Sequence, residues 1–216
     1  MAHIRVCYAF LELDEPARFT ATQLRGFLGN LFVDDVEFHH HLSNPYHYPL
    51  VQYKMINDQP MIMGFGEYAD MVFRRVSGIE KLVIKARISG VRSIDFRQEL
   101  FAIGGGQKNY RFVSPWIALN EKNYRTFLEA ESEVRATLLE KILIGNTLSM
   151  LKGLGILIDY RLNVKLTQAF PFLTRAHGKT FWGFLPEFTA NIDIPRYAGL
   201  GKSVSKGFGT VDIIDS

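Results

Sequence analysis

The 216-residue sequence predicts an α+β fold made of two consecutive units. In both halves of the chain, segments with an apolar residue at every second position, typical of half-buried strands, alternate with segments of helical periodicity. Hydrophobic residues make up 47% of the chain, which is enough for a core in each unit. Three glycines at positions 104 to 106 interrupt the pattern, and residues 95–106 contain the expected boundary.

The first half predicts the element order β-α-β-β-α-β. Residues 3–10 alternate loosely, as in a strand, and Thr20 with Gln23 matches the capping box of a helix. That helix carries an apolar stripe that suits packing on a sheet. The stripe consists of Leu24, Phe27, Leu28, Leu31 and Phe32. The remaining strand, strand, helix and strand are expected at residues 50–57, 60–65, 68–76 and 79–88.

The second half predicts β-α-β-β, a glycine-rich loop and a last strand. Asn120 is a suitable N-cap for a long helix over residues 121–143, which Gly145 and Gly153 end or interrupt. The strands are expected at residues 110–119, 156–167, 182–194 and 210–214. Because βαββαβ is the ferredoxin-like order, we expect tandem ferredoxin-like domains at residues 1–100 and 107–216. The second domain is expected to be a degenerate copy, in which the loop replaces the second helix.

Composition indicates which classes of protein the chain can belong to. The net charge of +3 and the pI of about 8.9 permit nucleic-acid binding without requiring it. The single cysteine, Cys7, excludes an internal disulfide framework and fits a reducing cytosol. No run approaches about 20 apolar residues, and no secretory signal is recognisable, so we expect a cytoplasmic protein without a membrane partner.

Residues 199–209 read GLGKSVSKGFG and predict an anion-binding loop. Glycines leave backbone N–H groups uncovered, while lysines and serines add charge and donors, a combination that suits a phosphate backbone. A mononucleotide P-loop is disfavoured because Arg196 stands where its first glycine belongs. A turn with a purely structural role remains an alternative. The candidate binding residues are Gly199, Gly201, Lys202, Ser203, Ser205, Lys206, Gly207 and Gly209.

Four of the six histidines lie within nine residues, at positions 39, 40, 41 and 47. In an extended segment, His39 and His41 share one face, and two imidazoles together suit acid–base chemistry near neutral pH. A metal site is an alternative, although no standard ligand spacing is present. Exposed histidines without a chemical role are a further alternative.

Two side chains that follow the histidines can assist chemistry on an anion. Tyr48 comes shortly after the turn at Asn44 and Pro45, where its phenol can position or protonate an oxyanion. Lys54 can neutralise developing negative charge. The alternatives are a tyrosine that packs at a strand end and a strand lysine that faces solvent.

Three motifs carry a family resemblance: FHHHL, then YHYPLVQYK, and FTANIDIPRYAGLGKSVSKGFGTV near the C-terminus. With them the chain resembles CRISPR repeat-RNA processing endoribonucleases of the repeat-associated (RAMP) superfamily, in the subtype with a paired-histidine active site. The resemblance implies tandem ferredoxin-like domains and cleavage of the CRISPR precursor transcript within repeats, without metal or other cofactor. It assigns His39 and His41 as the acid–base pair and Tyr48 as an assisting tyrosine, and Lys54 is the fourth catalytic candidate.

The implied reaction is attack by an RNA 2′-hydroxyl on the adjacent phosphorus, which leaves a 2′,3′-cyclic phosphate and a 5′-hydroxyl. Some relatives place a lysine on the first helix, where this chain has only Arg25. The expected partner is CRISPR repeat RNA, bound by the glycine-rich loop. A homodimer and contacts with interference-complex subunits are further partners left open. The alternative functions are a non-catalytic RNA-binding subunit and a metal-dependent hydrolase that uses the histidines.

Overall fold

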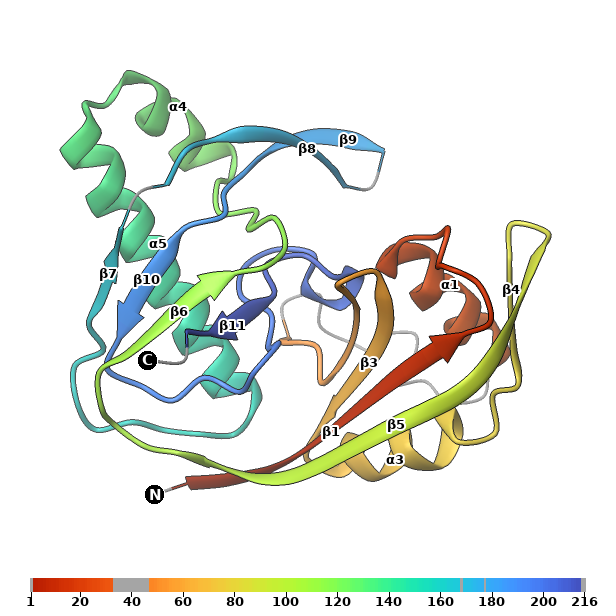
Figure 1. The fold of residues 1–216 in the computed structure, drawn as a ribbon. Helices are drawn as coiled ribbons and strands as arrows, with labels where there is room; N and C mark the ends of the chain where they lie inside the picture. The colour runs from red at the N-terminus through yellow and green to blue at the C-terminus, as the bar shows by residue number, and fades with distance from the viewer. Residues whose placement is uncertain (1, 33–46, 168, 177, 215–216) are drawn as a thin grey trace. The chain divides into compact units, whose positions relative to one another are not determined.

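A computed structural model describes residues 2–32, 47–167, 169–176 and 178–214. The chain forms two compact units, whose elements are labelled in Figure 1. The N-terminal unit contains His3–Ala102 together with Ser205–Gly207. The C-terminal unit contains Ile103–Val204 and the segment that begins at Phe208. The tip of the glycine-rich loop therefore belongs to the N-terminal unit, while both of its flanks belong to the C-terminal unit.

The N-terminal unit is a five-stranded sheet with two described helices. Its elements are β1 (Ala2–Leu13), α1 (Ala21–Leu31), β2 (Val51–Ile56), β3 (Gln59–Phe65), α3 (Glu67–Val76), β4 (Lys81–Ile84) and β5 (Arg87–Ile103). The strand order is β2-β3-β1-β5-β4. This is the ferredoxin-like order, with β5 as the fourth strand and β4 added at the edge. The expected α+β fold is confirmed in this unit.

Local signals explain the elements that agree with prediction. Thr20 and Gln23 make the expected capping box at the start of α1. Asn57 and Asp58 both have positive φ and join β2 to β3 in a tight hairpin. The single strand expected at 79–88 is instead a hairpin of β4 and β5, because Lys85 and Ala86 also adopt positive φ. After that turn, β5 continues to Ile103.

In β1, β2 and β3, buried side chains lie on both faces of the N-terminal sheet, whereas most of β5 is exposed or half-buried. One face packs on α1 and α3 through side chains that include Leu11, Tyr53, Leu24 and Val72. Alternation along the strands turns the intervening residues to the opposite face, and several of these are also fully buried. They include Lys54, Met61, Met63 and Phe65.

The C-terminal unit has a four-stranded sheet with the order β11-β6-β10-β7 and a separate hairpin of β8 and β9. Its elements are β6 (Lys108–Phe112), α4 (Glu121–Glu129), α5 (Ser132–Gly153), β7 (Val164–Leu166), β8 (Phe172–Ala176), β9 (Lys179–Gly183), β10 (Glu187–Ala190), the 3-10 turn η1 (Val204–Lys206) and β11 (Val211–Ile213). If β6, β7, β10 and β11 are numbered 1 to 4, their order in the sheet is 4-1-3-2, which is again ferredoxin-like. The segment between β10 and β11 stands where a second helix would be, as predicted.

The helix expected at 121–143 is two helices. Ala130 and Glu131 are extended, with ψ of 153° and 166°, and separate α4 from α5. α5 then runs through Gly145 and ends at Gly153. Neither helix, nor any other in the described part of the chain, is long and apolar enough to cross a membrane.

The prediction of a strand at residues 156–167 is wrong for most of its length, because only Val164–Leu166 pairs with another strand. The residues before it are held by the side chain of Asn191, whose Oδ1 accepts from the backbone N–H of Asn163 and whose Nδ2 donates to the Arg161 carbonyl. The strand predicted at 182–194 is divided. β9 pairs with β8 and β10 pairs with β6, with Phe184, Leu185 and Pro186 between β9 and β10. Of the strand predicted at 110–119, β6 includes only the part up to Phe112.

Candidate functional site

The flanks of the glycine-rich loop are joined like the strands of a hairpin. Gly199 forms a bridge with Thr210, and the Leu200 N–H donates to the Gly209 carbonyl at 2.8 Å. The Gly209 N–H in turn donates to the Pro115 carbonyl at 2.9 Å. The base of the loop is therefore fixed within the C-terminal unit.

Three loop glycines have positive φ and approach protein atoms closely. A Cβ at Gly201, where φ is +97°, would lie 2.7 Å from Trp116 Nε1. A Cβ at Gly209 would collide with the Leu200 carbonyl. At Gly207, where φ is +87°, a Cβ would lie 2.6 Å from the Ala21 Cβ. At these three positions, the backbone therefore uses the absence of a side chain to approach other atoms of the protein.

The loop tip lies against the beginning of α1 and the edge strand β2. Ala21 is the first residue of α1, and the Gly207 Cβ position is also 3.2 Å from the Tyr53 carbonyl oxygen. Burial lowers the pKa of Lys206, and the positive charge of Arg25 lowers it further. Arg25 and Lys206 are therefore close enough for their charges to interact. Together with the positive end of the α1 dipole, they make this part of the N-terminal unit cationic.

Tyr53 lies beneath this cationic group. Burial raises the pKa of its phenol, while the charge of Arg25 acts in the opposite direction. Its hydroxyl is buried and has no hydrogen-bond partner in the described part of the chain. Tyr53 was not among the predicted site residues, because its place in β2 alternation marks it as a core residue.

Lys54, on β2, and Tyr48, which precedes that strand, are both buried. Lys54 is fully buried, which lowers the pKa of its ammonium from 10.5 to about 7, so the interpretation of a solvent-facing lysine is wrong. Tyr48 is buried with its ring centroid 6.1 Å from that of Phe65. Lys54 is aligned with Met61 on β3.

The predicted acid–base pair, His39 and His41, lies outside the described residues, as does His40. The shared face of the two histidines remains a prediction. His47, at the start of the next described segment, is exposed.

The two loop lysines belong to different units. Lys206 lies near Arg25 in the N-terminal unit, whereas Lys202 lies in the C-terminal unit and donates from Nζ to the Leu119 carbonyl at 2.8 Å. Burial lowers the pKa of Lys202, and the charge of Glu121 opposes this shift. Ser203, between them, has a φ of 58°. The loop therefore presents its two cations in separate surroundings.

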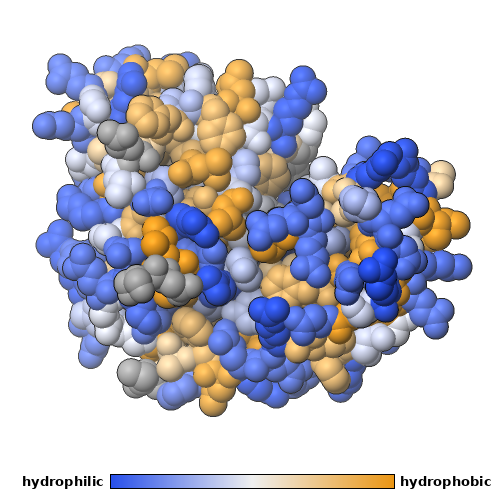
Figure 2. Space-filling view, in the orientation of Figure 1, coloured by the Kyte–Doolittle hydropathy of each residue, from blue (hydrophilic) through white to orange (hydrophobic). Residues whose placement is uncertain are grey.

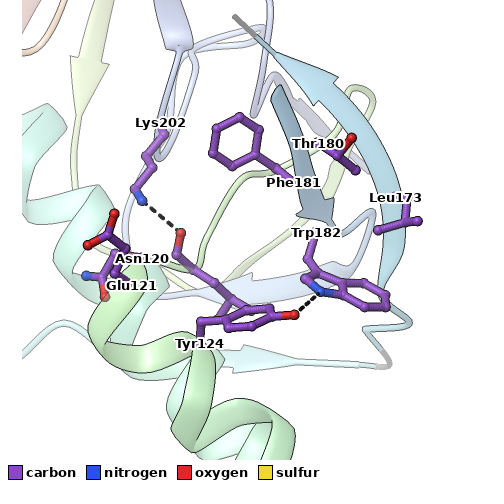
Figure 3. Close-up of a pocket in the computed structure, with 9 residues that line it drawn as sticks. Asn120, Glu121, Tyr124, Leu173, Thr180, Phe181, Trp182 and Lys202 are labelled. Carbon is purple, nitrogen blue, oxygen red and sulfur yellow. Dashed lines mark hydrogen bonds between the residues drawn. The ribbon is translucent and has the colours of Figure 1, made fainter. Parts of the chain in front are cut away.

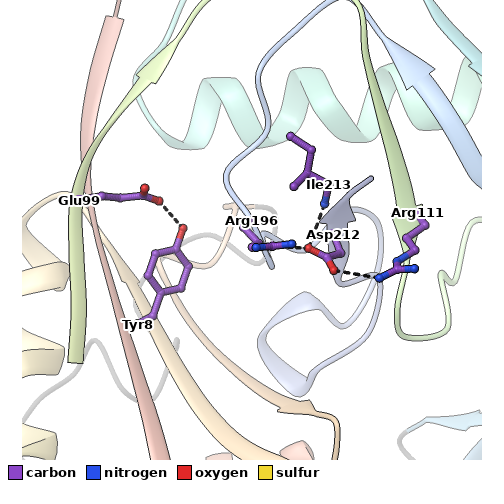
Figure 4. A network of polar contacts seen from close by, with 6 residues as sticks. All are labelled: Tyr8, Glu99, Arg111, Arg196, Asp212 and Ile213. Atoms are coloured by element: carbon purple, nitrogen blue, oxygen red, sulfur yellow. Dashed lines mark hydrogen bonds and ion pairs between the residues drawn. The ribbon is translucent and has the colours of Figure 1, made fainter. Parts of the chain in front are cut away.

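A charged network lies at the base of the loop (Figure 4). Asp212 on β11 is buried and accepts from Arg196 at 2.6 Å and from Arg111 at 3.4 Å. The two arginine side chains keep about half of their surface exposed, 45% for Arg196 and 53% for Arg111. In the N-terminal unit, the Tyr8 hydroxyl donates to Glu99 at 2.6 Å. Sequence reasoning did not find these arginines, because the carboxylate that orients them is distant in the chain.

Family models match the chain from end to end. The Cas6b N-terminal domain matches residues 2–102, and the Cas6b C-terminal domain matches residues 103–214. The uncharacterized protein MJ0978 of Methanocaldococcus jannaschii is 42% identical over 124 residues, which are 57% of this chain and 83% of that protein.

Solved structures agree with the family models. A crystal structure of Cas6b is 29% identical, with a TM-score of 0.87 over 99% of this chain and 100% of the other. A second, described as the CRISPR RNA processing endoribonuclease Cas6b, is 28% identical, with a TM-score of 0.78 over the same shares. These matches confirm the family predicted from the sequence motifs, while the paired-histidine subtype stays a prediction. The chain belongs to the Cas6b family.

Proposed function

We propose that this chain cleaves CRISPR precursor RNA within its repeats by metal-independent attack of a 2′-hydroxyl. The observation that carries the proposal is the end-to-end match to Cas6b, which includes a solved relative described as a CRISPR RNA processing endoribonuclease. The chain is accordingly an endoribonuclease. The products of the proposed reaction are a 2′,3′-cyclic phosphate and a 5′-hydroxyl.

His39 and His41 are the proposed acid–base pair. One imidazole removes the proton of the 2′-hydroxyl and the other protonates the departing 5′-oxygen, each step contributing about 10²–10⁴-fold. Tyr48 is the proposed assisting phenol. Lys54 is fully buried, and we therefore assign it a positioning role through its charge rather than contact with RNA.

The RNA backbone is proposed to bind the cationic group at the loop tip. Arg25 and Lys206 interact there at the positive end of α1. Arg25 thus supplies a cation on the first helix, the position where some relatives carry lysine. A phosphodiester that approaches this surface meets two cations and a helix N-terminus, an arrangement that favours an anion.

Incubation of the purified protein with labelled repeat RNA in EDTA tests the proposal. The control substrate carries one 2′-deoxy substitution at the cleavage site. We expect cleavage of the all-ribose RNA only, because the 2′-deoxy nucleotide lacks the hydroxyl group that attacks the phosphorus. His39→Ala and His41→Ala should abolish cleavage and leave RNA affinity largely unchanged.

Other outcomes separate the alternatives. Loss of cleavage in EDTA that Mg²⁺ or Zn²⁺ restores would establish a metal-dependent hydrolase. Tight binding without cleavage under any condition would favour a non-catalytic RNA-binding subunit. Cleavage of both RNAs, or wild-type rates in both histidine variants, would contradict the proposed site.

A further inference from the structure

A pocket that the proposed reaction does not use opens in the C-terminal unit (Figure 3). It has a volume of about 420 Å³, within the range of about 300–1,000 Å³ typical of small-ligand sites. It is built from the start of α4, the β8–β9 hairpin and one side chain of the glycine-rich loop. The lining residues that the argument uses are Asn120, Glu121, Tyr124, Leu173, Trp182 and Lys202.

The walls of the pocket are aromatic and partly open to solvent. Trp182 Nε1 donates to the Tyr124 hydroxyl at 3.2 Å, which holds the two rings in a fixed relation. Leu173 is directly opposite Trp182 in the hairpin and is 66% exposed. Figure 2 shows apolar side chains gathered over α4 and this hairpin. An apolar surface left exposed in this way commonly marks a binding site.

The rim of the pocket combines hydrogen-bond donors with acceptors. Asn120 Oδ1 accepts from the N–H groups of Lys122 and Asn123, both at 2.9 Å. Because these two bonds engage the oxygen of the side-chain amide, its NH₂ group is the part that can donate to a ligand. The carboxylate of Glu121 is an acceptor. Lys202 is exposed, and its ammonium carries a positive charge to the same rim.

We propose that this pocket holds one unpaired nucleobase of the RNA. Stacking on tyrosine and tryptophan is the usual way in which proteins bind splayed bases, with side chains that read the base edge. Glu121 can accept from an exocyclic amino group, Asn120 can donate to a ring acceptor or carbonyl, and Lys202 can neutralise the attached phosphate. The inference rests on the proposed function for its choice of RNA as the natural source of the base.

Mononucleotide titration followed by tryptophan fluorescence tests the pocket directly. The chain has two tryptophans, of which Trp116 is fully buried and only Trp182 lines the pocket. We expect AMP, CMP and GMP to quench the emission saturably, and UMP, which lacks an exocyclic amine, to bind most weakly. Trp182→Phe should remove the quenching signal. Tyr124→Ala should weaken binding roughly tenfold or more, as for one lost base stack.

Phe170→Ala is the matched control, since Phe170 is an exposed aromatic of the same unit that is not among the pocket residues. It should leave nucleotide binding unchanged, and near-UV circular dichroism checks that every variant is folded. Absence of saturable quenching by all four nucleotides would overturn the proposal. Equal affinity for all four would overturn the edge recognition by Glu121 and Asn120.

Repeat RNA with single abasic substitutions provides the second measurement. We expect one unpaired position at which loss of the base weakens binding to wild-type protein but not to Trp182→Ala. Cleavage in EDTA, measured on the same preparations, separates the two proposals. Normal cleavage with unchanged RNA affinity in Trp182→Ala and Tyr124→Ala would refute the pocket alone. Saturable nucleotide binding by a protein that never cleaves repeat RNA would refute the proposed reaction and support the pocket.

Discussion

Replacing Gly207 by alanine tests whether the loop tip is packed on α1. The backbone at Gly207 has a φ of +87°, and the added Cβ would lie 2.6 Å from the Ala21 Cβ. An L-residue in the left-handed region costs about 1–2 kcal/mol, and an overpacked contact costs about 1–3 kcal/mol more. We therefore expect Gly207→Ala to lower the free energy of unfolding by about 2–5 kcal/mol, or to release the tip from α1.

Two further variants separate backbone strain from collision. Gly155 also has positive φ, +72°, but its Cβ position meets no atom within 4 Å, so Gly155→Ala should show only the strain of about 1–2 kcal/mol. Ala21→Gly removes the atom that Gly207→Ala would strike. In the double variant, about 1–3 kcal/mol of the loss should be recovered as a coupling energy.

Urea unfolding and RNA affinity are the two measurements for this series. If the tip is displaced, Lys206 moves away from Arg25, and RNA affinity should fall in Gly207→Ala but not in Gly155→Ala. The reasoning is refuted if the two alanine variants are equally destabilised and Ala21→Gly recovers nothing.

Three other predictions follow from individual side chains. The pKa of Lys54 falls from 10.5 to about 7 on folding, so the unfolded chain binds more protons between these pH values and stability should rise with pH across that window. At about 1.4 kcal/mol per pKa unit, Lys54→Met should stabilise the protein at pH 7 by a few kcal/mol and flatten this pH dependence, as seen in urea midpoints at several pH values. Arg25→Ala and Lys206→Ala should each reduce the slope of log affinity against log salt by roughly 0.7–0.9, and an unchanged slope would exclude a phosphate contact. Asp212→Asn should lower stability by about 1–3 kcal/mol in denaturant unfolding, because Arg196 and Arg111 lose the carboxylate that orients them.

Prediction from sequence succeeded where the determining signal is local. The capping box of Thr20 and Gln23 is contained in four residues, and the turn at Asn57 and Asp58 is set by residues that tolerate positive φ. It failed at residues 156–163, where alternation is regular but no neighbouring strand is available to pair. A strand is defined by its partner, which periodicity does not reveal.

In the candidate site, too, local features could be predicted from the sequence and features that depend on distant segments could not. The density of glycine and lysine identified the loop, but the separation of Lys202 from Lys206 depends on the packing of Gly207 on Ala21. The pocket was missed because Tyr124, Trp182 and Lys202 come from three segments that are distant in the chain. The break between α4 and α5 at Ala130 also escaped prediction, since neither glycine nor proline marks it.

The membership of Ser205–Gly207 in the N-terminal unit has a consequence for synthesis on the ribosome. Domains commonly fold in order as the chain emerges, the first before the second is made. Here the edge of the first unit at β2 receives its last three residues more than 100 positions after that unit's own segment ends at Ala102. A nascent chain that stalls before residue 205 would therefore lack the residues that approach Ala21 and Tyr53, and this side of β2 would be left without them.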